Sequence, residues 1–243
     1  MDNTPLFFTM FFTIYLSAHF IVFRNWSPKT RLEAASCFIS LAHGTPAVFL
    51  AMHAIFFNPE THTFASKNNI SQNNVLEYSI AYFVMDLCHL LIFDPKDVLF
   101  IFHHLATLFV FVTCRYLVFH GAYGVLVLLA LAEVTSLLQN VWTLASAKKE
   151  ENEVAARVFY KISVPFYSLY SVVRGFVGPL FVYKMVLFYS SGVADNVVPK
   201  WVWVSWICVV VMAISVSILW VTNNWVVLYR ERMFKVENKK KVS

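Results

Sequence analysis

The sequence contains few charged residues for its length. Only 14% of its 243 residues are Asp, Glu, Lys or Arg, whereas soluble domains usually carry about 25%. Neither half of the chain has the polar composition of a water-soluble domain, so the composition predicts a polytopic membrane protein. The net charge of +5 then reflects where lysines lie relative to the membrane, and we expect no binding to nucleic acid.

Cysteine is scarce, and its spacing excludes a disulfide framework. The four cysteines all lie inside apolar stretches, and no pair has the CxxC spacing of a metal or redox site. They are Cys37, Cys88, Cys114 and Cys208.

The first apolar stretch lacks the features of a cleaved signal peptide. It has no basic segment before it and no Ala-x-Ala cleavage site, so we expect it to be retained as a helix.

Long apolar stretches are abundant, and each is long enough to cross a membrane. A spanning helix needs about 20 largely apolar residues, and only helices and closed barrels satisfy the backbone in lipid. The sequence therefore predicts an all-α protein with seven spans. They cover residues 5–23, 33–57, 76–93, 97–117, 122–146, 158–189 and 201–228. The sixth span contains Pro165, Gly175, Gly178 and Pro179, and we expect it to be kinked.

Lys and Arg residues collect on one side of these spans, which predicts the orientation of the chain. The richer side has Arg24, Lys29, Arg31, Lys96, Lys148, Lys149, Arg157 and the basic tail. The other side has Lys67, Arg115 and Lys200. Since cytoplasmic loops carry the excess of positive charge, we expect a cytosolic C-terminus and a lumenal N-terminus.

Two short motifs fit this orientation. Lys240 and Lys241 stand at the fourth and third places from the end, as in the di-lysine signal that returns proteins to the endoplasmic reticulum through a retrieval coat. A basic patch attracted to anionic lipid is the alternative interpretation. Asn69, in the sequence Asn-Ile-Ser, is a glycosylation sequon on the predicted lumenal side.

The adjacent residues His103 and His104 lie within the fourth span, where ionisable side chains are costly and indicate function. Asp86 and His89 are three residues apart on the third span, so they share a helix face. A four-residue turn joins these two spans as an antiparallel hairpin. We therefore expect Asp86 and His89 to face the histidine pair, with His103 and His104 as the catalytic candidates if the protein is an enzyme. One histidine should face a cavity while the other packs against a helix. The seven-residue stripe of Asp97, His104 and Phe111 favours His104 as the functional one.

A second set of polar residues lies on the fifth and sixth spans. Glu133 and Asn140 are seven residues apart on one face, and Asn140 lies at the depth of the histidine pair. Arg174 lies at a depth comparable to that of Glu133, and opposite charges in lipid should pair. We predict a Glu133–Arg174 ion pair, with Tyr170 supporting the guanidinium. Its alternative roles are a purely structural bridge or part of a lipid-binding surface.

Other intramembrane histidines are interpreted as packing residues. They are His19, His43 and His53. Zinc would need three or four ligands, which Asp86, His89 and the histidine pair could supply, but no HExxH or CxxC spacing supports it. We predict no metal and no cofactor, with acyl-CoA as a possible co-substrate.

Four segments resemble the TRAM–Lag1–CLN8 (TLC) domain family, in order and spacing. They are Tyr82-Phe-Val-Met-Asp-Leu, Ile101-Phe-His-His-Leu, Ala132-Glu-Val-Thr-Ser-Leu-Leu-Gln-Asn-Val-Trp and Val173-Arg-Gly-Phe-Val-Gly-Pro. The sequence is most similar to the small transmembrane-protein-56-like members. This resemblance implies that spans 2–7 form a six-helix barrel around an intramembrane tunnel. It divides the chain into an N-terminal helix and loop (1–30), a TLC domain (31–231) and a basic cytosolic tail (232–243).

The resemblance leaves three functions open. The first is an endoplasmic reticulum protein that binds an acyl lipid and affects membrane lipid composition, with Asp86, His89, Glu133, Asn140 and Arg174 lining the tunnel. The second is an acyl-CoA-dependent acyltransferase of ceramide-synthase type. Those enzymes place an Asp pair in the next helix, whereas residues 118–146 contain no Asp. The third is a trafficking or translocation-associated protein without lipid chemistry.

Overall fold

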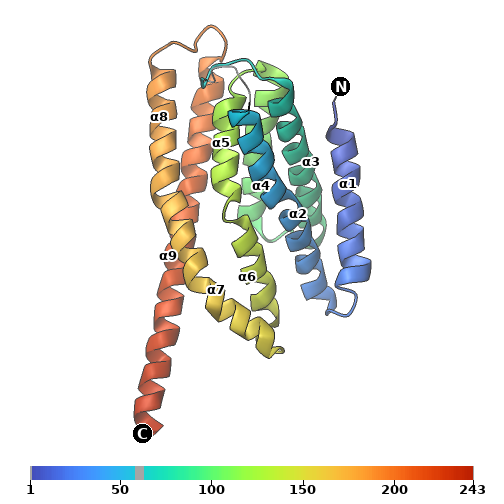
Figure 1. Ribbon diagram of the computed structural model, residues 1–243, viewed down its shortest axis with the longest axis vertical. Helices are drawn as coiled ribbons and strands as arrows, with labels where there is room; N and C mark the ends of the chain where they lie inside the picture. Colours follow the sequence, from blue (N-terminus) through green and yellow to red (C-terminus); the bar gives the residue numbers. More distant parts are fainter. Residues whose placement is uncertain (1, 58–62, 243) are drawn as a thin grey trace.

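The chain folds into a bundle of long helices, seen in the computed structural model in Figure 1. The structure describes residues 2–57 and 63–242, with side chains described up to Arg230. The α-helices are α1 (Thr4–Ser17), α2 (Pro28–Phe56), α3 (Ile70–Phe93), α4 (Val98–Val112), α5 (Ala122–Glu133), α6 (Ser136–Lys148), α7 (Glu153–Val172), α8 (Gly178–Ser190) and α9 (Lys200–Val242). Three π-helical segments extend or join them: η1 (Ala18–Val22), η2 (Thr113–Val118) and η3 (Val173–Val177).

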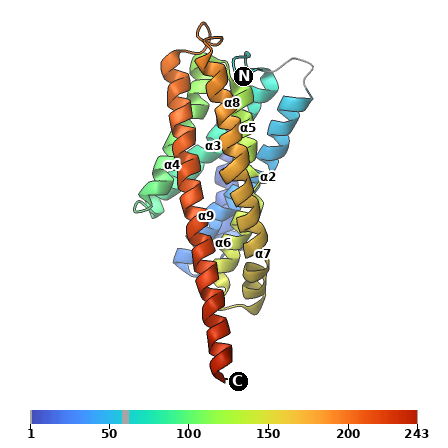
Figure 2. The same ribbon diagram turned by 90° about the vertical axis from the view of Figure 1, so that its left-hand side faces the viewer.

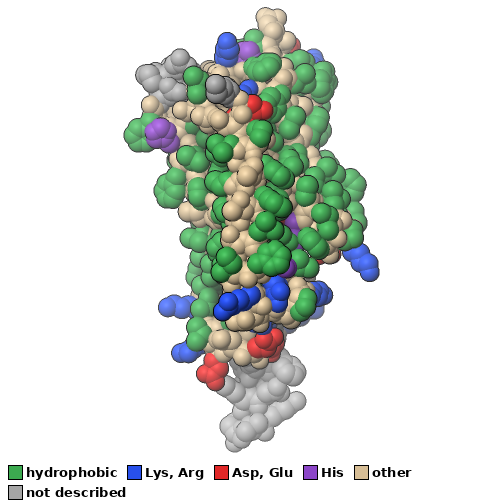
Figure 3. Space-filling view, turned by 90° about the vertical axis from the view of Figure 1, so that its right-hand side faces the viewer, with side chains coloured by type: hydrophobic (Ala, Val, Ile, Leu, Met, Phe, Trp, Pro, Cys, Tyr) green, Lys and Arg blue, Asp and Glu red, His purple; other side chains and the backbone are tan. Residues whose placement is uncertain are grey.

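Within the described residues, seven helical segments are long and apolar enough to cross a membrane, which confirms the predicted all-α polytopic class. The two termini lie at opposite ends of the bundle, and α9 extends well beyond it (Figure 1). We call these ends the N-terminal side and the C-terminal side. Figure 3 shows hydrophobic side chains over the middle of one face and a band of Lys and Arg toward the C-terminal side, as expected for a molecule that crosses a bilayer.

Polar caps define where several spans begin. The Asp97 carboxylate accepts a hydrogen bond from the Phe100 N–H at 3.1 Å, so α4 starts directly after the four-residue turn that follows α3. Asn69 and Gln72 form a reciprocal capping box at the start of α3, which satisfies two backbone donors that a helix start leaves free. Because of this cap, α3 begins six residues earlier than the hydropathy pattern predicts.

The fifth span is broken, contrary to the single helix that its apolar sequence predicts. Helix α5 ends at Glu133 and α6 begins at Ser136, with a turn between them. No Pro or Gly marks this break, so local propensity gave no signal for it. The sixth span is interrupted as predicted, by the π-helical segment η3 before Pro179 at the start of α8.

The order in which helices pack places α2 and α3 at the centre of the site. Helix α2 packs on α3, α5 and α6, and α3 packs on α4. Helix α4 also contacts α9, which runs along α7 and α8 (Figure 2). Helix α1 lies outside this set, against α2 and α3 (Figure 1). The enclosed tunnel stays a prediction.

A glycine allows α2 to lie close to the break in the fifth span. A Cβ atom on Gly44 would lie only 2.6 Å from Glu133 Oε2 and 2.6 Å from Ser136 Oγ. Real Cβ contacts are essentially never that short, so only glycine lets α2 approach the break between α5 and α6. This contact brings the polar residues of three helices together.

Candidate functional site

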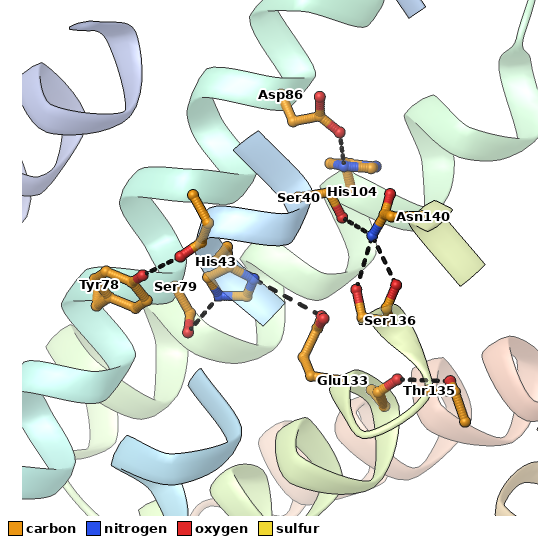
Figure 4. A network of polar contacts seen from close by, with 12 residues as sticks. Ser40, His43, Tyr78, Ser79, Asp86, His104, Glu133, Thr135, Ser136 and Asn140 are labelled. Atoms are coloured by element: carbon orange, nitrogen blue, oxygen red, sulfur yellow. Dashed lines mark hydrogen bonds and ion pairs between the residues drawn. The ribbon is translucent and has the colours of Figure 1, made fainter. Parts of the chain in front are cut away.

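Polar side chains from five helices converge around α2 (Figure 4). We call this set the polar centre. Its members labelled in Figure 4 are Ser40 and His43 of α2, Ser79 and Asp86 of α3, His104 of α4, Glu133 of α5, and Ser136 and Asn140 of α6. Ser36 of α2 belongs to it through its hydrogen bond to Asp86. Buried polar groups require hydrogen-bond partners, and here α2, α3, α4 and α6 supply most of them to one another. Within the described residues, His43 Nδ1 is the member of this set that has none.

Asp86 and His104 form the most tightly bonded pair of the polar centre. Their atoms Oδ2 and Nε2 lie 2.9 Å apart, and both side chains are at most 5% exposed. The Ser36 hydroxyl donates to the other carboxylate oxygen at 2.7 Å. The contact between the third and fourth spans that the short hairpin predicts is thus present in the structure.

This pairing uses both ring nitrogens of His104. Its Nδ1 lies 2.9 Å from the carbonyl oxygen of Phe100, which only accepts, so Nδ1 carries a proton and donates it. One further proton is shared between Nε2 and the Asp86 carboxylate, whichever atom holds it. His104 therefore has no free nitrogen for a ligand, and its role in the structure is to hold α4 against α3.

His103 has the opposite environment. Its side chain is exposed, and in the described part of the chain its ring nitrogens have no hydrogen-bond partner. The ring lies 6.5 Å from Phe83 and 5.7 Å from His104, measured between centroids. The charge of Arg174, on η3, also acts on it. Of the two catalytic candidates, His103 rather than the favoured His104 is therefore the one whose nitrogens are free to meet a ligand.

His43 belongs to the polar centre rather than to the apolar packing that its isolated position predicts. It is fully buried, and its Nε2 lies 3.1 Å from the Ser79 hydroxyl. Its other nitrogen, Nδ1, is 3.8 Å from Glu133 Oε1, which is too long for a hydrogen bond. The ring stacks on Tyr82 with a centroid distance of 4.0 Å.

Asn140 ties α6 to α2. Its side-chain nitrogen donates to the Ser40 hydroxyl at 2.9 Å and to the Ser136 carbonyl oxygen at 2.9 Å. The residue is 8% exposed. Its predicted position at the depth of the histidine pair thus brings it into the polar centre.

The predicted ion pair between Glu133 and Arg174 is wrong. In the described residues no carboxylate lies within 4 Å of the guanidinium, and Arg174 Nη2 instead donates to the Ala132 carbonyl oxygen at 3.2 Å. The break after α5 explains the difference, because it leaves that carbonyl without its helical partner and a cation is favourable at a helix C-terminus. Tyr170 supports the guanidinium as predicted, with its ring centroid 5.4 Å from Cζ.

His89 also departs from its expected place. Its Nδ1 lies 2.9 Å from the hydroxyl of Tyr15 in α1, and the residue is buried. It therefore fixes the first span to α3 and does not face the histidine pair. Asp86 and His89 lie only about 60° apart around the helix, and their partners differ because α1 packs on α3 beside His89.

In residues 2–57 and 63–230, no group of three or more His, Cys, Asp or Glu side chains is arranged to hold a metal ion.

Sequence reasoning missed Ser36, Ser40, Ser79 and Ser136, which give or accept the hydrogen bonds of the polar centre. For Ser36 and Ser40 the sequence held one signal, since they fall on one face of α2 with His43.

The fold and the site together define a polytopic helical membrane protein with a buried polar centre inside its apolar bundle. Comparison with known proteins gives the family. Residues 33–225 match the TLC domain, and the chain is 58% identical over 234 residues to TLC domain-containing protein At5g14285 of Arabidopsis thaliana. That alignment covers 96% of this chain and 92% of the relative.

The chain therefore belongs to the TLC domain family, as its sequence motifs predict. The matched region begins in α2 and ends in α9, so it omits α1. No solved structure matches the chain.

Proposed function

We propose that this protein binds acyl lipids within the membrane and affects membrane lipid composition. The single observation that carries the proposal is the contrast between the two adjacent histidines. Both ring nitrogens of His104 are hydrogen-bonded, one to Asp86 and one to the Phe100 carbonyl oxygen. The His103 ring is exposed, and its nitrogens have no hydrogen-bond partner among the described residues. A rigidly held turn that presents one unbonded polar group in an apolar environment suits the polar end of a lipid.

The surroundings of His103 support an acyl ligand. Around it, α4 has large apolar side chains that are exposed in the isolated bundle, such as Phe102 at 64% and Leu99 at 58%. A hydrocarbon chain can cover such side chains while the histidine meets the ester, carboxyl or amide. Membership of the TLC domain family, which is often associated with membrane lipids, agrees with this ligand class.

A lipidome comparison tests the proposal. Membranes from cells that lack the protein are compared with membranes in which the wild type, His103→Ala or His53→Ala is restored. His53 is also an exposed histidine on a spanning helix, so it is the matched control. We expect the wild type and His53→Ala to restore the lipid composition and His103→Ala to fail at equal amounts of folded protein. Full restoration by His103→Ala would refute the proposal.

One observation favours acyltransfer as a second candidate. An unbonded imidazole nitrogen can take a proton from a hydroxyl or amine, and the Arg174 charge acts at the same place. The test is incubation of the purified protein with a labelled acyl-CoA and lipid acceptors. Product that disappears in His103→Ala but persists in His53→Ala would establish it, and no product with any acceptor would leave lipid binding alone.

Residence in the endoplasmic reticulum, with a cytosolic tail, is part of the proposal. The loops after α1, α3 and α6 lie on the C-terminal side and carry Arg24, Lys96 and Lys149. Such an excess is typical of the cytosolic face. Protease added to intact microsomes should remove a C-terminal tag, and changing both Lys240 and Lys241 to Ser should release the protein from the endoplasmic reticulum. A protected tag would contradict the orientation.

A further inference from the structure

Arg174 is a cation inside the membrane-spanning part whose hydrogen-bonding capacity is largely unused. A guanidinium has five N–H donors, and its one hydrogen bond to another described residue is the 3.2 Å contact from Nη2 to the Ala132 carbonyl oxygen. Its Nε is buried and has no partner in the described structure. Burying an unsatisfied donor on a charged group is expensive, so this atom indicates a missing acceptor.

The neighbouring carboxylate does not supply that acceptor. Glu133 lies near enough for its charge to interact with Arg174, but it is not within 4 Å of the guanidinium. Its closest basic contact is His43, at 3.8 Å. Since the polar centre already holds Glu133, the free donors of Arg174 remain for a group from outside the protein.

The segment that carries Arg174 is accessible from the membrane. Arg174 lies in η3, and π-helical turns are frequent at functional sites. The next residue is Gly175, where an added Cβ would meet no atom within 4 Å. Arg174 also lies near enough for its charge to act on His103, and among the described residues both side chains keep nitrogens without a hydrogen-bond partner.

We propose that Arg174 binds the oxyanion of an acyl lipid, a carboxylate or a phosphate, through the N–H groups that Ala132 leaves free. This inference rests on the proposed function and names the chemistry of its ligand. The planar fork of a guanidinium matches two oxygens of a carboxylate or phosphate. A neutral lipid such as a long-chain alcohol offers no such group and would leave the buried cation unpaired.

A competition experiment on the purified full-length protein in nanodiscs tests this. A photoreactive long-chain carboxylic acid labels the protein, and oleate, lysophosphatidate with an oleoyl chain, and oleyl alcohol compete. We expect at least one anion to compete about tenfold or more better than the alcohol, because hydrogen bonds to charged groups contribute about 1.5–3 kcal/mol. The better of the two anions identifies the carboxylate or the phosphate as the group bound.

Two variants assign the effect to Arg174. Arg174→Lys keeps the positive charge and the overall size but loses the fork and Nε, so the anion preference should fall about tenfold while the melting temperature changes little. Arg157→Gln removes an exposed arginine on α7 and should leave the preference unchanged. Equal competition by alcohol and anions, or a full anion preference in Arg174→Lys, would overturn the inference while lipid binding stands. Absence of any labelling would overturn the proposed function as well.

Discussion

Gly44→Ala should disrupt the contact that assembles the polar centre. The new Cβ would lie 2.6 Å from Ser136 Oγ and 2.8 Å from Ser136 Cβ. Ordinary van der Waals contact begins at 3.4 Å, so α2 and the α5–α6 break must separate by roughly 0.6 Å to relieve the Cβ contact, in a packed interior that transmits such strain. The Ser136 hydroxyl can rotate away, but its Cβ is fixed to the backbone.

The magnitude follows from two opposing effects. Overpacking of this kind costs about 1–3 kcal/mol, while replacing a helical glycine by alanine gains up to about 1 kcal/mol. Gly175→Ala is the matched control, because its Cβ would meet nothing within 4 Å. It should therefore show only the stabilisation from replacing glycine by alanine. The two variants should differ by about 1–3 kcal/mol, and each kcal/mol shifts the melting temperature by about 2–4 °C in a chain of this size.

Thermal melting of the purified protein in one detergent measures the difference. The double variant Gly44→Ala with Ser136→Gly removes both clashing Ser136 atoms and should recover part of the loss. Equal melting temperatures for Gly44→Ala and Gly175→Ala would refute the close approach of α2 to the break. So would a double variant that loses the sum of the two single changes.

Three further outcomes follow from the charged contacts. Asp86→Ala should destabilise the protein by about 3–5 kcal/mol, because it leaves a buried histidine without its partner; a loss below 1 kcal/mol in chemical unfolding would contradict the pairing. Glu77→Ala should cost about as much, since the 1% exposed Glu77 accepts bonds from both Arg115 and the N-terminal backbone; protease cleavage should then rise at the first helix, and unchanged cleavage would argue against this anchor. A double-mutant cycle of Glu133→Gln and Arg174→Met should give a coupling below about 1 kcal/mol, because the two side chains do not touch; a coupling of several kcal/mol would restore the ion pair.

The seven spans were predictable because each depends on the local apolar composition of the chain. The contact between Asp86 and His104 was predictable too, since two helices joined by a four-residue turn must pack side by side. The support of Arg174 by Tyr170 follows in the same way from their separation of four residues on one helix. These features depend on neighbours in sequence or on a single short turn.

The remaining contacts depend on helices that are distant in the sequence. No Pro or Gly in the sequence indicates the break after Glu133. This break frees the Ala132 carbonyl oxygen, to which Arg174 donates a hydrogen bond. His43 reaches Glu133 only because the adjacent glycine lets three helices approach. His89 turns to Tyr15 because α1 packs on α3, a placement that no local pattern specifies.

The central claim is that an acyl lipid meets the bundle at His103. Photolabelling of intact membranes with a diazirine-bearing fatty acid, followed by mass spectrometry of the labelled peptides, tests it most directly. We expect labels on residues 99–107 of α4 and 172–178 around η3, and we expect His103→Ala to reduce them while His53→Ala leaves them unchanged. Labels confined to outward residues such as Leu180 and Leu187, with no change in His103→Ala, would contradict the account.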